Sequence, residues 1–232
     1  MTEHILDNPA WHAMVSFNSH LAFGDDDVRY FPENVSPFAG LRNPGAKSLS
    51  QLFDMLPAER VIASVTARAL DIPNSWKILY QASLLQMTGE NFMAPGSHTI
   101  EISSIGKQHV PQMLSLTKLT NPGPFAGRTI EFGNYTGIFD SGELVAMAGQ
   151  RLHPFNYIEI SAVCTHPDHA GKGYGKALVA YQAEQILSAG STPFLHTRGD
   201  NTMAIRLYER LGFTVRREVM FYVIQKPLHE II

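Results

Sequence analysis

The sequence predicts an α/β (α+β) protein in which helices and strands alternate, with the clearest pattern after about residue 97. Three observations support this expectation. The chain of 232 residues is 44% hydrophobic and 17% charged, so it can bury a substantial core. Short runs of strand-like sequence are followed by segments in which apolar residues recur at helical spacing. A glycine-rich loop separates one such run from the helical segment after it.

The composition excludes several classes of protein. The formal net charge is -3, so we expect no general nucleic-acid-binding surface and no nucleic-acid partner. No apolar run reaches the ~20 residues that span a bilayer, and residues 1–4 lack the features of a signal peptide. Cys164 is the only cysteine, which excludes an intramolecular disulfide and a cysteine-built zinc site. We therefore expect a soluble cytoplasmic protein with no membrane partner and no bound metal.

A break in the pattern at residues 93–97, where proline and glycine interrupt both helices and strands, divides the chain. It predicts an N-terminal α/β part over 1–95 and a second part over 97–232. The N-terminal part has no arrangement of residues typical of catalysis. Its predicted elements are a helix after the Asp7-Asn8-Pro9 cap, a helix through residues 49–56 and a strand at 61–65.

The second part has stronger signals for each element. Ser141-Gly142 indicates a hairpin turn, Asn201 suits a helix N-cap, and Gly212 suits the end of that helix. We expect Arg216-Arg217 to be a solvated pair on a strand. In chain order, the predicted elements are helix 108–119, strands 136–140 and 143–148, strand 157–164, a helix after the glycine-rich loop, strand 193–196, helix 201–211, and strands 213–215 and 219–224.

The glycine-rich loop over residues 170–176 lies between a predicted strand and a predicted helix. Free backbone N–H groups, the positive end of the helix dipole and two lysines make phosphate its natural ligand. A dinucleotide-binding fingerprint would need glycine where Lys176 stands, and a P-loop would need serine or threonine where Ala177 stands. Neither nucleotide motif is therefore present. The alternative is that the glycines only form a tight connection.

Two separated motifs resemble those of the GCN5-related N-acetyltransferase (GNAT) family. The segment 159–178 resembles that family's pyrophosphate-binding motif, and the segment 194–213 resembles its second signature, especially in the FR47-like branch. The resemblance covers residues 97–232. It implies the GNAT fold, a central mixed sheet that is splayed between its middle strands and flanked by helices, with acyl-CoA in the split. The N-terminal part resembles the degenerate companion half of glycine N-acyltransferase-like relatives.

The resemblance also implies a set of residues that bind acetyl-CoA, the co-substrate. The backbone after residue 160 should pair with the pantetheine arm, and the glycine-rich loop should hold the phosphates. Ala170 occupies a place that usually holds arginine or glutamine, so we expect weaker cofactor binding. The implied cofactor-binding residues are Ser161, Val163, Cys164, Thr165, Ala170, Gly171, Lys172, Gly173, Tyr174, Gly175, Lys176 and Asn201.

Amide formation from a thioester requires an acid and a base, and the resemblance offers residues for both. Tyr208 occupies the tyrosine place of the second signature, where a protonated phenol can donate to the departing thiolate; the alternative is that it only packs in the core. Glu159 and His196 compete as the base, with a water relay as a third possibility. Period-two alternation predicts that Glu159 shares a strand face with Ser161 and Val163.

The resulting hypothesis is an acyl-CoA-dependent N-acyltransferase, which transfers acetyl from acetyl-CoA to a primary amine by direct attack in a ternary complex. Cys164 is disfavoured as a nucleophile, because a lone cysteine on a strand is usually a core residue. The alternative is a GNAT-fold module of weak or no activity that senses acyl-CoA or acts as a scaffold. The sequence does not specify the acceptor amine, and a homodimer is one expectation for the assembly.

Overall fold

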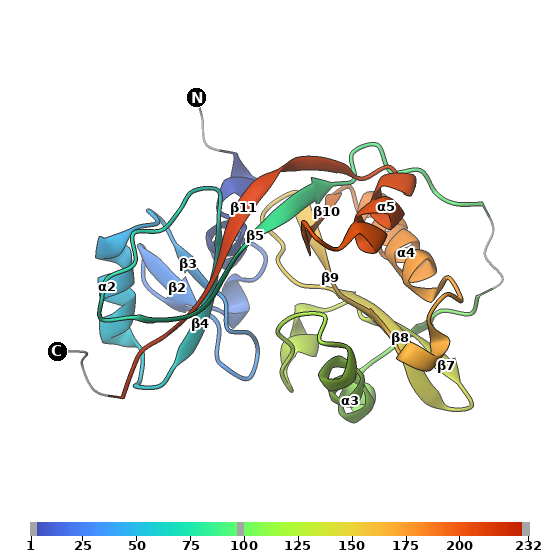
Figure 1. Ribbon diagram of the computed structural model, residues 1–232, viewed down its shortest axis with the longest axis horizontal. Helices are drawn as coiled ribbons and strands as arrows, with labels where there is room; N and C mark the ends of the chain where they lie inside the picture. Colours follow the sequence, from blue (N-terminus) through green and yellow to red (C-terminus); the bar gives the residue numbers. More distant parts are fainter. Residues whose placement is uncertain (1–3, 97–99, 229–232) are drawn as a thin grey trace.

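A computed structural model describes residues 4–96 and 100–228, which form two lobes joined by one twisted sheet of eight strands (Figure 1). The strand order is β4-β11-β5-β10-β9-β8-β7-β6. β9 and β10 are parallel, and the other neighbours are antiparallel, so the sheet is mixed as the sequence predicts. Its strands are β4 (Val61–Thr66), β5 (Lys77–Thr88), β6 (Ser103–Ser104), β7 (Thr136–Asp140), β8 (Glu143–Gln150), β9 (Tyr157–Thr165), β10 (Thr192–Arg198) and β11 (Thr214–Gln225).

Helices cover both faces of the sheet in the second lobe. α4 (Tyr174–Ser188) and α5 (Thr202–Arg210) pack on one face, and α3 (Val110–Thr120) packs on the other. The first lobe contains α1 (Pro9–Met14), α2 (Ala46–Met55) and a small sheet of β1 (Phe23–Gly24), β2 (Val28–Tyr30) and β3 (Ala39–Leu41). Short 3-10 turns lie at Ile5–Asp7, Ser19–Leu21, Lys107–His109, Thr129–Phe132 and Pro167–His169.

Local sequence signals explain the elements nearest the site. Ser141 and Gly142 both have positive φ, as a tight two-residue hairpin turn between β7 and β8 requires. The Asn201 side chain caps α5 by accepting from the backbone N–H of Ala204, and Gly212, at φ 84°, ends the turn after that helix. These predicted features are confirmed.

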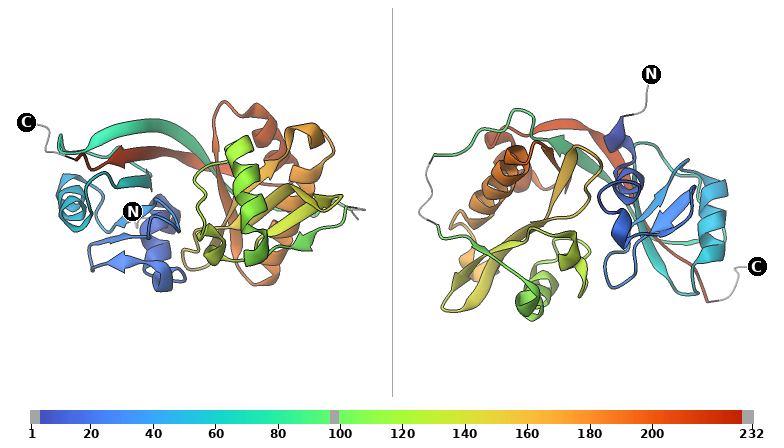
Figure 2. Two further views of the ribbon diagram at one scale, coloured as in Figure 1. Left: turned by 90° about the horizontal axis from the view of Figure 1, so that it is seen from below. Right: turned by 180° about the vertical axis from the view of Figure 1, so that it is seen from behind.

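Two expectations about the strands are corrected. The closing segments 213–215 and 219–224 are not separate strands, because β11 runs through both and absorbs Arg216 as a bulge between Val215 and Arg217. The twelve-residue strand β5 was not predicted at all, although it lies between β11 and β10 in the sheet. Figure 2 shows β5 and β11 as a long ribbon that bridges the two lobes.

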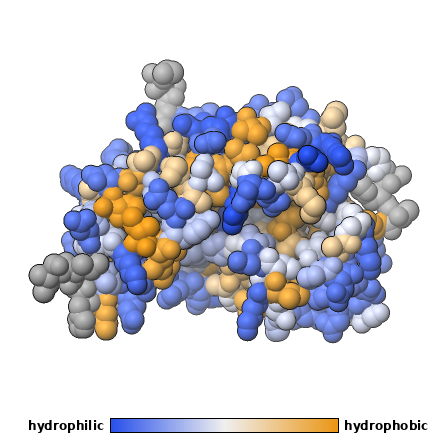
Figure 3. Space-filling model, in the orientation of Figure 1, coloured by the Kyte–Doolittle hydropathy of each residue, from blue (hydrophilic) through white to orange (hydrophobic). Residues whose placement is uncertain are grey.

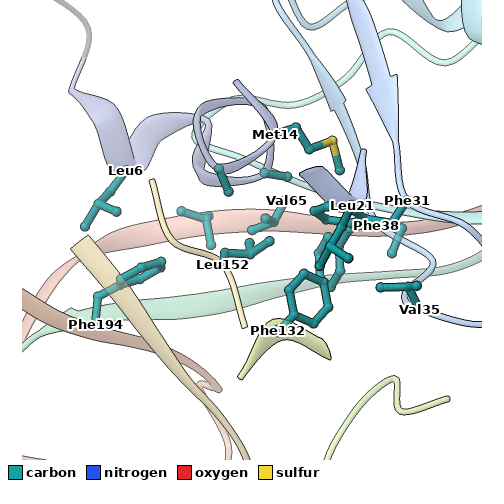
Figure 4. Close-up of a cluster of buried hydrophobic side chains, with 14 residues drawn as sticks. Leu6, Met14, Leu21, Phe31, Val35, Phe38, Val65, Phe132, Leu152 and Phe194 are labelled. Atoms are coloured by element: carbon teal, nitrogen blue, oxygen red, sulfur yellow. The ribbon is translucent and has the colours of Figure 1, made fainter. Parts of the chain in front are cut away.

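The core continues across the two lobes. Leu6, Met14, Phe31 and Val65 of the first lobe belong to one buried cluster with Phe194 of β10 (Figure 4). The sheet also crosses the expected boundary, since β4 and β5 pair with β11 from the far end of the chain. Residue 97, where the second part was expected to begin, lies outside the described residues. The division at 95–97 and the companion-half interpretation of residues 1–95 remain predictions.

Candidate active site

The sheet splits between its two parallel strands. The pairing of β9 with β10 runs only from Tyr157–Thr192 to Glu159–Phe194, and beyond that point the described residues of the two strands diverge (Figure 1). A cavity of about 870 Å³ occupies the split, and hydrophobic residues are visible inside a hollow on this face in Figure 3. Residues 160–165 of β9 line one wall of the cavity, and Asn201 and Tyr208 line it from the side of α5.

A bulge in β9 changes which side chains face the site. Ala162 has φ 54°, and β9 has one more residue than β8 between the pairs Cys164–Met147 and Ser161–Gly149. The alternation reverses there, so Val163 packs with α4 while Ala162 and Cys164 pack on the side of α3. The expectation that Val163 shares a face with Glu159 by strict alternation is therefore wrong.

The glycine-rich loop has an open backbone at the start of α4. Gly171 and Gly173 have φ near +80°, and a Cβ atom built on either would meet nothing within 4 Å. The first N–H groups of the 15-residue helix α4 have no intrahelical acceptor, so an anion can approach them. A Cβ built on Gly175 would lie 3.9 Å from Thr165 Oγ1, which brings the loop to the end of β9. This geometry fits a pyrophosphate outside the cavity mouth.

Tyr208 brings a protonated phenol to the cavity. Its side chain packs against Phe213, with ring centroids 6.2 Å apart, and the residue is 9% exposed. Burial raises the pKa of Tyr208 to about 12, so the hydroxyl keeps its proton at neutral pH. The residue therefore combines access to the cavity with the packing role that the sequence left as an alternative.

Glu159 and His196, which the sequence offered as competing bases, are in direct contact. His196 Nδ1 lies 2.8 Å from Glu159 Oε1, and Arg151 holds both carboxylate oxygens at 2.7 and 2.9 Å. Burial alone would raise the pKa of Glu159, but the charge and hydrogen bonds of Arg151, together with the His196 contact, hold it well below its usual range. Glu159 is therefore an ion-pair partner that binds protons weakly.

A line of polar side chains continues from His196 into the first lobe. His196 Nε2 lies 3.0 Å from the amide nitrogen of Gln86, whose oxygen accepts from Arg216 at 2.7 Å; Arg216 in turn pairs with Asp7 at 2.7 Å. Since the Gln86 amide donates to Nε2, Nδ1 must carry the imidazole proton and donate it to Glu159. We call the series Arg151, Glu159, His196, Gln86, Arg216 and Asp7 the polar chain.

Several of the contacts in and beside the polar chain were not anticipated. Arg216 and Arg217 were expected to be solvated, but both bind the Asp7 carboxylate, at 2.7 and 2.8 Å. Gln86 was recognisable as a polar residue inside the apolar run 84–87, where it is fully buried. Arg151 follows β8 without any local pattern, so only the folded chain reveals its contact with Glu159.

Other chemistry-bearing residues have clear surroundings. Cys164 is 7% exposed, and burial raises the pKa of its thiol to about 11, which disfavours a thiolate nucleophile. Within residues 4–96 and 100–228, no group of three or more histidine, cysteine or acidic side chains is arranged to hold a metal ion. In the same ranges, no helix is long and apolar enough to cross a membrane.

Solved structures resemble this chain over nearly its whole length. A putative acetyltransferase from the GNAT family of Novosphingobium aromaticivorans has 31% sequence identity and a TM-score of 0.89, covering 97% of this chain and 99% of that one. A GCN5-related N-acetyltransferase from Kribbella flavida has 15% identity and a TM-score of 0.62, covering 94% and 96%, a likeness in fold alone.

Sequence comparisons match a shorter region. The family model described as FR47-like protein matches residues 135–222. A mycothiol acetyltransferase from Streptomyces griseus is 32% identical over 83 residues, which are 35% of this chain and 27% of that protein. The N-alpha-acetyltransferase RimI from Mycobacterium tuberculosis is 32% identical over 84 residues, 34% of this chain and 51% of that protein. The match thus spans about a quarter to a half of these relatives.

Proposed function

Because this chain belongs to the GCN5-related N-acetyltransferase family, we propose that it transfers an acetyl group from acetyl-CoA to a primary amine by direct attack in a ternary complex. The observation that carries the proposal is the cavity in the split between β9 and β10, which has the β9 backbone on one wall and the Tyr208 phenol on another. In the proposed step the amine nitrogen attacks the thioester carbonyl carbon, the C–S bond breaks, and the amine loses one proton while the thiolate gains one.

Acetyl-CoA fits both the cavity beside β9 and the glycine-rich loop. The backbone of residues 161–165 would pair with the pantetheine arm, because the described part of β10 leaves that edge of β9 without a ladder partner. The loop of residues 170–176 would hold the pyrophosphate through its N–H groups and the positive end of α4. In this arrangement the phosphates would lie outside the cavity mouth, and the thioester would point inward toward Tyr208.

Tyr208 is the proposed acid. Its raised pKa, about 12, keeps a proton available for the thiolate of CoA throughout the neutral range. Its place on α5, beside the cavity, supports this role.

His196 is the proposed base, and Glu159 is its positioning partner. The low pKa of Glu159 and its two bonds from Arg151 argue against proton uptake by the carboxylate itself. Glu159 instead orients the imidazole through Nδ1 and stabilises the imidazolium that forms when Nε2 takes the amine proton, directly or through water. The Gln86 amide must then release Nε2, since two donors cannot share a hydrogen bond.

Two measurements test the proposal. Acetyl-CoA at millimolar concentration should raise the melting temperature, while ATP and NADH at the same concentration should not. Release of free CoA across a panel of primary amines then separates an enzyme from the sensor or scaffold alternative, which Ala170 in the loop favours. A melting temperature that acetyl-CoA does not change would contradict both the enzyme and the sensor hypotheses. A shift in melting temperature without turnover of any amine would favour the sensor.

The base assignment has its own test. With an acceptor amine of low pKa, His196→Gln should remove the acidic limb of the kcat/KM profile, because that limb reports protonation of the base. The profile of the control His20→Gln, at an exposed residue outside the cavity lining, should keep it. An acidic limb that persists in His196→Gln would assign the proton to a water relay.

The proposal keeps two further expectations from the sequence, a cytoplasmic location and a homodimer. Fractionation of the native cells would test the first. Light scattering on the purified protein would test the second, by comparing its mass in solution with that of one chain.

A further inference from the structure

One wall of the cavity is apolar and largely aromatic. Five residues from the first lobe, β5 and β11 form it: Phe38, Val65, Tyr80, Leu84 and Phe221. Their positions in the sheet explain this. Val65 of β4 lies directly opposite Phe221 of β11, so both side chains stand on the same face. β5, paired on the other side of β11, contributes Tyr80 and Leu84 to that wall.

Three of these rings pack together, of which Tyr80 and Phe221 are partly exposed and Phe38 is buried. The ring centroids of Phe38 and Phe221 lie 6.1 Å apart, and those of Tyr80 and Phe221 lie 6.3 Å apart. The Arg151 guanidinium lies 4.7 Å from the centre of the Phe38 ring, which joins this wall to the polar chain. Tyr80 is 43% exposed, so part of its ring is open to a ligand. Rings at this spacing suit a flat apolar group that stacks or packs edge-on.

The charges of the cavity set a second condition on the acceptor. Glu159 is the only carboxylate among the described residues that line the cavity, and it is already bound by Arg151 and His196. Arg198, the other arginine of the lining, already pairs with Asp200, which is not a lining residue. An acceptor with a second ammonium group, such as a polyamine or an amino sugar with several amines, would find no free carboxylate in the described lining. Burying such an unpaired charge is costly.

We infer that the acceptor is a small molecule with one primary amine carried on an aromatic or similarly flat apolar group. The inference rests on the proposed function and adds the class of its second substrate. The apolar group packs against Tyr80 and Phe221, and the amine points along the cavity toward the thioester and His196. The cavity of about 870 Å³ also receives the thioester end of acetyl-CoA, so the space left for the acceptor suits a small molecule.

An amine panel tests this assignment with the full-length protein. We expect kcat/KM for 2-phenylethylamine to exceed that for n-butylamine by at least tenfold, since the phenyl ring buries more apolar surface. Spermidine and glucosamine should be poorer than 2-phenylethylamine by a similar or larger factor. Preference for spermidine, glucosamine or a peptide N-terminus over 2-phenylethylamine would overturn the inference while leaving an active acetyltransferase. No CoA release with any amine would instead count against the proposed function.

Variants then test whether the aromatic wall of the cavity causes the preference for 2-phenylethylamine. Tyr80→Ala should raise KM for 2-phenylethylamine about five- to tenfold and change kcat little, with a much smaller effect on n-butylamine. Leu79→Ala is the matched control, because Leu79 is the preceding residue of β5, is 44% exposed and lies outside the cavity lining. Phe221→Leu keeps an apolar side chain and should also lower the preference for 2-phenylethylamine over n-butylamine. Equal changes for both amines in Tyr80→Ala and Phe221→Leu would overturn the inference.

Discussion

At the scale of single residues, Glu159 shows how its neighbours decide what a carboxylate can do. On a strand beside a cofactor-binding loop, a glutamate has the right chemistry for a base. The guanidinium of Arg151, whose side chain is 11% exposed, keeps Glu159 ionised, so that it acts as a structural anion that orients His196. The same pairing makes Glu159 important for stability, since an uncompensated buried charge is strongly destabilising.

Glu159→Gln should therefore destabilise the protein by about 3–5 kcal/mol at pH 7, because Arg151 would be left buried without its partner. The pKa of Glu159 is lower in the folded than in the unfolded chain, so its contribution is complete above the unfolded value of ~4.3 and is lost as the pH falls below it. Urea unfolding at pH 7 and at successively lower pH should show the difference between the two proteins shrinking.

The exposed Glu209 of α5 offers a control for that measurement. Glu209→Gln should change the free energy of unfolding by no more than about 0.5 kcal/mol at each of these pH values. A Glu159→Gln protein as stable as the wild type at pH 7 would contradict the assignment of Glu159 and Arg151 as a mutually dependent buried pair.

Tyr208→Phe tests the acid at the same scale. The variant keeps the ring that packs on Phe213 and removes only the hydroxyl, so we expect kcat to fall by roughly 10²–10⁴-fold while acetyl-CoA affinity stays nearly constant. Steady-state kinetics and the acetyl-CoA-dependent rise in melting temperature measure the two effects separately. Tyr181→Phe on α4, outside the cavity lining, serves as the control. Full turnover by Tyr208→Phe would assign proton delivery to water.

At the scale of elements, the start of α4 carries the phosphate-binding prediction. Gly173→Val places a branched side chain where the backbone must approach the pyrophosphate, so the protein should fold but lose most of its acetyl-CoA-induced rise in melting temperature. Gly190→Val is a closely matched control, because Gly190 has φ +76° and open space around it but follows the opposite end of the same helix. Equal acetyl-CoA shifts in the two variants would contradict the assigned site.

The elements also show which parts of the fold a sequence can predict. The β7–β8 hairpin and the cap of α5 depend on residues within a few positions of each other, and both were predicted. β5 was missed because its first half is exposed and its end is buried, which leaves no regular alternation. Its partner β11 lies more than a hundred residues away in the chain, so no local pattern could pair them.

The same limit applied within the site. The sequence motifs led to Tyr208, Glu159 and His196, because each lies within or beside a recognisable local signature. The contact of Glu159 with Arg151 depends on how β8 and β9 pair, and the reversed face of Val163 depends on one bulge residue, Ala162. Neither follows from spacing along the chain.

At the scale of the whole molecule, the sheet shared by the two lobes predicts that they unfold as one cooperative unit. A fragment of residues 97–232 would lack β4 and β5, leaving both edges of β11 and one edge of β10 unpaired. We expect this fragment alone to show no cooperative thermal transition by circular dichroism, and to gain one when refolded together with residues 1–96. A cooperative transition of the fragment alone would instead establish it as an independent domain.

The position of β11 between β4 and β5 also governs how the chain can fold during its synthesis. β4 and β5 are made early, but the strand that joins them begins only at Thr214, 126 positions after β5 ends at Thr88. At ~5–20 residues per second, the ribosome needs roughly 6–25 s to cover that distance. Throughout this interval the nascent chain carries two strands with open edges and the apolar residues Ile78 and Leu79. We therefore expect the nascent chain to be open to strand pairing with other polypeptides until translation is almost complete.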